Sequence, residues 1–135
     1  MEDVLAHANR LGLRVKFADL GRRAGEVHSS GVVFINHTRS LLTQRVTLAH
    51  ECGHWVLGHD WTSAHDRARD EREADTYAAR LLISPQAYAA AEALVGPHDG
   101  AIARELVVPA ALLPLWRASY LRRVGVVRHL RAASE

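Results

Sequence analysis

A five-residue segment near the middle of the chain has the residue types and spacing of a metal site with a proton acceptor. The segment is His50-Glu51-Cys52-Gly53-His54, an H-E-x-x-H pattern. Residues four apart lie on one face of a helix, so the imidazoles of His50 and His54 can reach the same ion. Glu51 is offset around the helix by one residue and can face a metal-bound water without being a ligand. The pattern predicts a hydrolytic metal centre with Glu51 as its general base.

The third ligand of such a centre has to come from elsewhere, because a catalytic zinc usually takes three protein ligands and keeps one open position. A metzincin site would need glycine at position 57 and histidine at position 60. The residues there are Leu57 and Asp60, which excludes that class. His59 follows Gly58 at the expected end of the helix. We expect His59 to lie at the helix terminus or to support a ligand, without binding the ion.

A carboxylate on a following helix offers another route to the third ligand. On a helical wheel of about 100° per residue, Asp70 and Glu71 lie within about 50° of the centre of the apolar stripe, and Glu73 lies more than about 100° away. This geometry removes Glu73 but not Asp70, and the longer side chain favours Glu71. Asp75 lies one turn beyond Glu71 and could orient a ligand histidine. The alternative for this acidic stretch is a solvated face that pairs with nearby arginines.

Peptide-bond hydrolysis would also need a donor for the oxyanion of its tetrahedral intermediate. The candidates are Tyr77, His59 and His65, although Tyr77 also falls on the apolar stripe, where core packing is the alternative. The run from Gly31 to Asn36 is either an edge strand that pairs with an extended substrate or a buried strand. Cys52 points away from the ligand face, and we expect it to pack in the core instead of acting as a nucleophile.

The elements that must position these groups follow from hydrophobic periodicity. Apolar spacing predicts a helix over residues 2–11, a strand over 13–17 and a hairpin whose turn is 29–31. The later part of the chain has helical spacing. The expected helices run from a cap at Ser40 or Thr43 to about Gly58, from Ser63 to Ile83, from Pro85 to near Gly96, and in two shorter patterns over 100–124 broken by Pro109 and Pro114.

This order predicts an α+β fold, in which a small antiparallel β-sheet packs on the H-E-x-x-H helix and further helices. The length of 135 residues suits one metallopeptidase domain over residues 1–135, with a basic helical tail from about residue 121. We expect that tail to be a solvated amphipathic helix. No apolar run is long enough to span a membrane, and the N-terminus lacks the pattern of a secretion signal. With Cys52 as the single cysteine, we expect a cytoplasmic protein.

Two stretches of the chain, Thr47 to His54 and Glu71 to Leu82, resemble the ImmA/IrrE family of zinc metallopeptidases. The second stretch is similar to the family pattern of Glu, two residues, Ala, Asn or Asp, an aromatic residue, Ala and a later Leu-Leu. Tyr77 stands where Phe is commoner, and Ile83-Ser84-Pro85 replaces Met-Pro. The resemblance covers roughly residues 1–120 and implies a zincin-like fold.

The resemblance further implies that His50, His54 and Glu71 bind zinc and that Glu51 is the catalytic base. Mn²⁺ or Co²⁺ could occupy the same ligands. By resemblance, the protein substrate would be a helix-turn-helix repressor or antitoxin, whose cleavage would derepress genes of a mobile element, a phage or a stress response. The alternatives are a metal-bearing module that sequesters a repressor without cleavage, and a DNA-binding regulator. We expect no membrane partner and no direct nucleic-acid binding.

Overall fold

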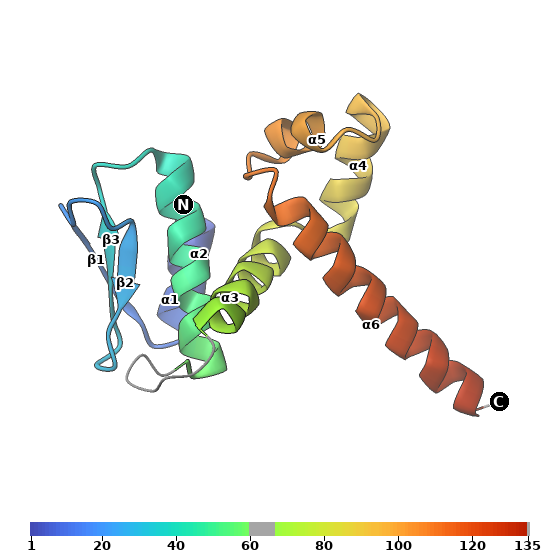
Figure 1. Ribbon diagram of the computed structural model, residues 1–135, viewed down its shortest axis with the longest axis horizontal. Helices are drawn as coiled ribbons and strands as arrows, with labels where there is room; N and C mark the ends of the chain where they lie inside the picture. Colours follow the sequence, from blue (N-terminus) through green and yellow to red (C-terminus); the bar gives the residue numbers. More distant parts are fainter. Residues whose placement is uncertain (60–66, 135) are drawn as a thin grey trace. The chain divides into compact units, whose positions relative to one another are not determined.

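A computed structural model describes residues 1–59 and 67–134, without the side chains of residues 126–134. The described chain divides into two compact units, residues 1–82 and 83–135 (Figure 1). The elements are α1 (Glu2–Arg10), β1 (Arg14–Ala18), β2 (Gly25–Val27), β3 (Val32–Asn36), α2 (Leu41–Leu57), α3 (Arg67–Leu82), α4 (Pro85–Val95), α5 (Asp99–Leu106) and α6 (Leu112–Ser134). This order confirms the α+β class, and the single domain over residues 1–135 stays a prediction. Among the described residues, no helix is both long and apolar enough to cross a membrane.

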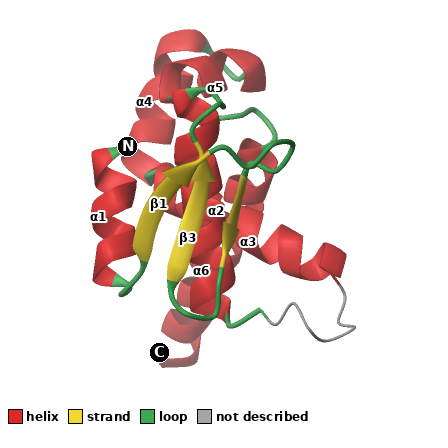
Figure 2. Ribbon diagram, turned by 90° about the vertical axis from the view of Figure 1, so that its left-hand side faces the viewer, coloured by secondary structure: helices red, strands yellow, loops and turns green. Residues whose placement is uncertain are grey.

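The three strands form one mixed sheet with the order β1-β3-β2 (Figure 2). Strands β2 and β3 are antiparallel and joined by a tight turn, in which Gly31 has a φ of +86°. Strand β1 runs parallel to β3, so the prediction of a purely antiparallel sheet was wrong. The loop after β1 carries the chain past the position of β3 before β2 begins, and β3 then enters between the two. Alternation of apolar residues reveals a strand but not its neighbours.

This strand order also decides the role of the run from Gly31 to Asn36. Strand β3 has a neighbour on both sides and is the buried central strand. The expected edge strand for a substrate is therefore not β3, and β2 occupies that edge instead. Val33 and Ile35 of β3 are fully buried.

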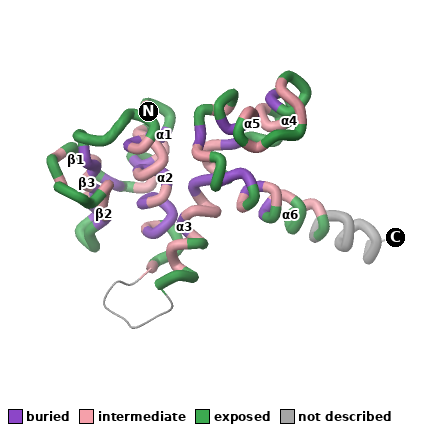
Figure 3. The backbone as a smooth tube through the Cα atoms, turned by 45° about the horizontal axis from the view of Figure 1, so that its top comes forward, coloured by how far each residue is buried: buried purple, intermediate pink, exposed green. Residues whose placement is uncertain are grey.

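One face of the sheet forms the core of the first unit with α1 and α2. The fully buried side chains of this core come from the sheet and from both helices. The buried stretches of β3 and α2 can be followed in Figure 3. They include Val4 and Ala8 of α1, Val33 and Ile35 of β3, and Leu48, Ala49 and Cys52 of α2. Helix α3 packs on α2, which is thus held between the sheet and a second helix.

Helix α2 begins and ends where the sequence predicts. The Ser40 hydroxyl accepts a hydrogen bond from the backbone N–H of Thr43, which settles the choice of N-cap. Gly58 ends the helix in the left-handed conformation, with a φ of 65°. The expected start of the next helix at Ser63 lies outside the described residues.

A glycine allows the edge strand to lie directly on α2. A Cβ atom at Gly25 would lie 2.6 Å from Cγ2 of Thr47 and 2.9 Å from the carbonyl oxygen of Phe34. Because side chains do not tolerate such contacts, only glycine permits β2 to approach α2 this closely at this point. The edge of the sheet is thereby placed beside the face of α2 that carries His50 and His54.

The second unit consists of α4, α5 and α6. The Trp116 indole N–H donates to the carbonyl of Ile83, and its ring stacks between Tyr88 and Tyr120. Pro109 precedes α6 as expected, but Pro114 does not break the helix. It lies in the first turn of α6, where the N–H that proline lacks would have no helical partner. The predicted tail from residue 121 is therefore the continuation of one helix.

The side chain of Asn36 ties the loop before β2 to the start of α2. It is fully buried at the end of β3. Its amide donates to the carbonyls of Gly21 and Arg23, and its oxygen accepts from the N–H and the hydroxyl of Thr38. Asn36 thus satisfies polar groups of two connections that flank the sheet.

Replacing Asn36 by alanine should lower the free energy of unfolding by about 3 kcal/mol, because buried donors and acceptors lose their partners. The exposed Asn9 is the matched control, and its replacement by alanine should change stability by less than about 0.5 kcal/mol. Urea unfolding followed by circular dichroism measures both. Equal, small effects would show that the Asn36 hydrogen bonds contribute little.

Candidate metal centre

Three side chains from α2 and α3 converge on one point. The Nε2 atoms of His50 and His54 are 2.9 Å apart. Glu71 places Oε2 2.9 Å from Nε2 of His50 and Oε1 3.1 Å from Nε2 of His54. All these atoms are metal-ligating types, and the triangle is small enough for one ion to contact each side chain at the bond lengths that zinc takes, about 2.0–2.2 Å.

Helix packing at Gly53 brings Glu71 to the two histidines. A Cβ atom at Gly53 would lie 3.0 Å from Cβ of Tyr77 and 3.1 Å from Cα of Ala74. Glycine on α2 and alanine on α3 therefore let the two backbones come close. Glu71 lies one turn before Ala74 on α3, and the close crossing keeps its side chain within reach of α2.

The protonation of the two histidines is set by their different surroundings. Burial and the charge of His50 lower the pKa of His54 to about 4, so that its ring is neutral at neutral pH, as metal binding requires. Burial also acts to lower the pKa of His50, but the hydrogen bond and charge of Asp75, together with the charge of Glu71, outweigh it and raise the pKa. A bound cation would favour the neutral form of His50.

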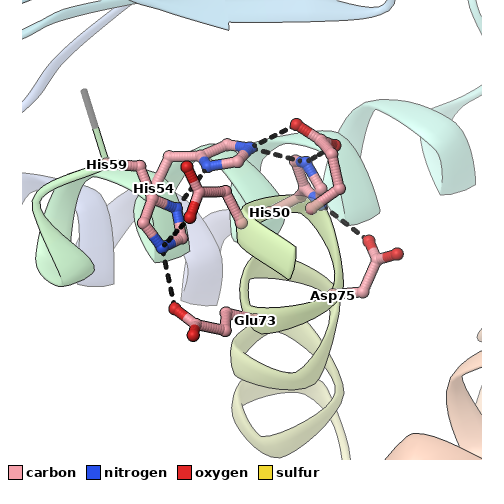
Figure 4. Close-up of polar contacts among 7 residues, drawn as sticks. His50, His54, His59, Glu73 and Asp75 are labelled. Carbon is pink, nitrogen blue, oxygen red and sulfur yellow. Dashed lines mark hydrogen bonds and ion pairs between the residues drawn. The ribbon is translucent and has the colours of Figure 1, made fainter. Parts of the chain in front are cut away.

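Asp75 holds the ring of His50 from the side opposite Glu71. Its Oδ1 lies 2.7 Å from Nδ1 of His50 (Figure 4). The carboxylate can accept the Nδ1 proton, which leaves Nε2 of His50 without a proton and directed at Glu71 and His54. Such a contact is what the orienting role predicted for Asp75 requires, and that role stays a prediction.

Glu51 lies beside the three ligand side chains without joining them. Its side chain is buried, and the backbone N–H of Val27 in β2 donates to it. Oε2 is buried and has no hydrogen-bond partner among the described groups. Burial raises the pKa of Glu51 to about 7; the charge of His50 opposes this shift and that of Glu71 adds to it. A carboxylate with a free oxygen and such a pKa is suited to accept and return a proton near neutral pH.

A cavity of about 870 Å³ opens over these groups. The residues of β2 form one of its walls, and the histidines of α2 with Glu51 and Glu71 form another. His28, which follows β2, also lines the cavity, and its side chain is half exposed. The sequence analysis did not single out His28. Its position directly after a short predicted strand, in a chain whose candidate site contains histidines, could have indicated it.

The remaining predicted residues divide between the site and its surroundings. His59 lines the cavity and contacts His54 and Glu73. The hydroxyl of Tyr77 is hydrogen-bonded to His7 at 2.6 Å, and Tyr77 is not among the residues that line the cavity. The structure therefore does not bring this candidate oxyanion donor to the cleft.

Two further residues of the sequence-based set remain. His65 lies outside the described residues. Cys52 is fully buried in the core, and burial raises the pKa of its thiol to about 12, so the thiol stays protonated and packs as expected.

Comparisons with known proteins identify the family to which this chain is similar. The model of the family Peptidase_M78, described as the IrrE N-terminal-like domain, matches residues 8–113. No curated protein matches the chain. Among solved structures, a Mycobacterium tuberculosis transcriptional regulator matches with a TM-score of 0.59 and 18% identity, over 82% of this chain and 38% of that one. At this identity the likeness shows a shared fold only, and this chain corresponds to well under half of the regulator.

Replacing Glu71 by glutamine should lower zinc affinity by about 100-fold or more, since the site loses its one anionic ligand and the amide binds cations weakly. Glu92, an exposed carboxylate on α4, is the matched control, and its replacement by glutamine should leave affinity unchanged. Competition with a chromogenic chelator measures both. Undiminished affinity of the Glu71→Gln variant would remove Glu71 from the ligand set.

Replacing Gly53 by alanine should weaken zinc binding and lower the free energy of unfolding by about 1–3 kcal/mol, because α3 must move away from α2. The matched control is Gly125→Ala in α6, where nothing lies within 4 Å of the added Cβ. That variant should be more stable by about 0.5–1 kcal/mol, as alanine is the better helix former. Thermal unfolding and zinc titration test the pair; a stabilised Gly53→Ala variant with normal zinc affinity would contradict the packing argument.

Proposed function

This chain belongs to the IrrE N-terminal-like domain family of peptidases, and from that premise we propose that it is a zinc-dependent metalloendopeptidase. The observation that carries the proposal is the buried, unpartnered Oε2 of Glu51 beside a His-His-Glu ligand set. A module that only sequesters a protein needs no proton acceptor at this position. The fold also fits the zincin-like architecture that the resemblance implies.

His50, His54 and Glu71 would hold the ion, and Mn²⁺ or Co²⁺ could take the same ligands as zinc. When bound, the ion supplies Lewis-acid chemistry, which acidifies a water molecule and polarises the scissile carbonyl. Asp75 keeps the ring of His50 oriented by accepting its Nδ1 proton. Helix α2 thus provides the two histidines, and helix α3 provides both Glu71 and the carboxylate that supports His50.

Glu51 would move the proton in this reaction. Its free Oε2 accepts a proton from the attacking water, and the same carboxyl group then donates it to the leaving amine. The N–H of Val27 binds the carboxylate and fixes its position against β2. Burial raises the pKa of Glu51 to about 7. The carboxyl group can therefore both accept and release a proton near neutral pH.

The substrate would be an extended peptide segment that pairs with β2. This strand has one neighbour in the described sheet, and Gly25, Glu26 and Val27 line the cavity. Exposed strand edges bind extended peptides through main-chain hydrogen bonds. His28, which follows β2, is an additional candidate donor for the oxyanion, because it lines the same cavity with a half-exposed ring.

We place the substrate among helix-turn-helix repressors or antitoxins, as the family resemblance implies, with gene derepression in the cytoplasm as the result. A sequestering module and a DNA-binding regulator are the alternatives. The solved relative is titled a transcriptional regulator, which is said of that protein. The basic α6 helix carries no recognisable nucleic-acid reading motif.

Replacing Glu51 by glutamine should abolish cleavage, with a loss of at least about 100-fold, while zinc binding is retained. Zinc-loaded wild type and variant are incubated with the repressor or antitoxin encoded beside the gene for this chain and with an intact protein library, and new termini are read by mass spectrometry. Cleavage by wild type alone supports the peptidase. If both proteins bind a partner and neither cuts it, the chain is a sequestering module.

A further inference from the structure

A second histidine, His59, contacts the proposed metal ligand His54 on the side away from the candidate metal centre. Gly58 turns the chain back at the end of α2, and the N–H of His59 donates to the carbonyl of His54 at 3.1 Å. The ring of His59 therefore lies beside that of His54, with 5.0 Å between ring centroids. The side chain of His59 is 7% exposed, so its nitrogens rely on protein partners.

The contacts of these rings form a continuous chain to α3. Nδ1 of His54 lies 2.8 Å from Nδ1 of His59, and Nε2 of His59 lies 2.9 Å from Oε2 of Glu73 (Figure 4). The other oxygen of Glu73 accepts from Nε of Arg69 at 2.9 Å. Glu73 therefore pairs with an arginine on its exposed side, as expected of this acidic stretch, and with His59 on its other side.

The positions of the protons in this chain follow from the ligand role of His54. Its Nε2 faces His50 and Glu71, and a nitrogen that binds a metal carries no proton. The proton of His54 is then on Nδ1 and is donated to Nδ1 of His59. A neutral ring has one proton, so that of His59 is on Nε2 and is donated to the Glu73 carboxylate.

We propose that His59 and Glu73 are positioning residues, which fix the tautomer and ring orientation of His54 as a zinc ligand through this relay. The proposal rests on the metal site of the proposed function. His50 is held directly by a carboxylate, whereas His54 is held by a carboxylate through a second imidazole. Partners of this kind raise metal affinity because the ligand needs no reorganisation when the ion binds.

A different use of the same residues would be a second metal ion bound by His59, Asp70 and Glu73, whose ligand-type atoms lie within 4.8 Å of one another. The geometry favours the relay. Both oxygens of Glu73 already accept hydrogen bonds, and Oδ1 of Asp70 is 3.6 Å from Nε2 of His59, too far for a hydrogen bond. We therefore expect one zinc ion per chain.

The test uses zinc titration of the full chain. Replacing His59 by phenylalanine keeps a ring in place and removes both hydrogen bonds, and zinc affinity should fall 10- to 100-fold. Glu73→Gln keeps an acceptor but removes the charge, and affinity should fall less, by about 3- to 10-fold. The controls His37→Phe and Glu92→Gln change exposed residues of the same types and should have no effect. Circular dichroism checks that the variants fold.

Nitrogen-15 NMR of the zinc-loaded protein gives a readout that a purely structural role would not move. In the wild type, His54 should carry its proton on Nδ1 and His59 on Nε2, and the His59 proton signal should shift upfield in Glu73→Gln. A His59 protonated on Nδ1 would overturn the relay. So would unchanged affinities in both variants with normal zinc binding, which would leave the proposed function standing.

Two stoichiometric outcomes complete the test. If the wild type binds two ions and His59→Phe binds one, the cluster is a metal site and the relay is wrong. If the wild type binds no zinc, the proposed function itself fails and the relay falls with it. One ion in every variant, with the ordered loss of affinity, supports the proposal.

Discussion

Helix α3 crosses α2 at Gly53, where an added Cβ atom would lie 3.0 Å from Cβ of Tyr77. The candidate ligands come from both helices. The glutamate side chain has only two methylene groups between its backbone and its carboxylate, so it cannot make up for a much wider separation of the helices. The approach of the two backbones therefore controls whether Glu71 can reach His50 and His54. The same approach places Asp75 and Glu73 where they meet His50 and His59.

On its other side, α2 packs against β2, and this contact also requires a glycine. Gly25 lies so close to α2 that a Cβ atom would overlap Thr47, and two residues later the N–H of Val27 binds Glu51. Helix α2 thus receives the carboxylate of the candidate metal centre from α3, and the partner of the candidate proton acceptor from β2. Two glycines in different elements set the two distances on which the chemistry depends.

The sequence allowed part of this arrangement to be predicted, because part of it is local. The spacing of His50 and His54 fixes their common face on any helix, and Ser40 and Gly58 mark the ends of that helix by their own backbone preferences. Glu71 could be favoured over Glu73 since an apolar stripe shows which side of α3 faces inward. These inferences need only the geometry of a single helix.

What escaped prediction depends on contacts between elements. A helical wheel for α3 gives the direction of each side chain relative to the apolar stripe of that helix. It cannot show that His59, just after the end of α2, lies beside Glu73. The apolar stripe of α3 likewise does not show that the hydroxyl of Tyr77 is hydrogen-bonded to His7 of α1. The parallel pairing of β1 with β3 depends likewise on the path of a loop. Each of these is a long-range choice that no local pattern encodes.

The charges gathered at the candidate site favour the binding of a cation. Glu51, Glu71 and Asp75 lie around His50, and their negative charges raise its pKa despite burial. Without a cation, the folded protein can relieve this repulsion by protonating His50 or Glu51, which removes either a ligand or the proton acceptor. A divalent ion offsets the carboxylates while leaving His50 neutral and Glu51 free to exchange its proton. Metal binding and the working protonation state are therefore one linked equilibrium.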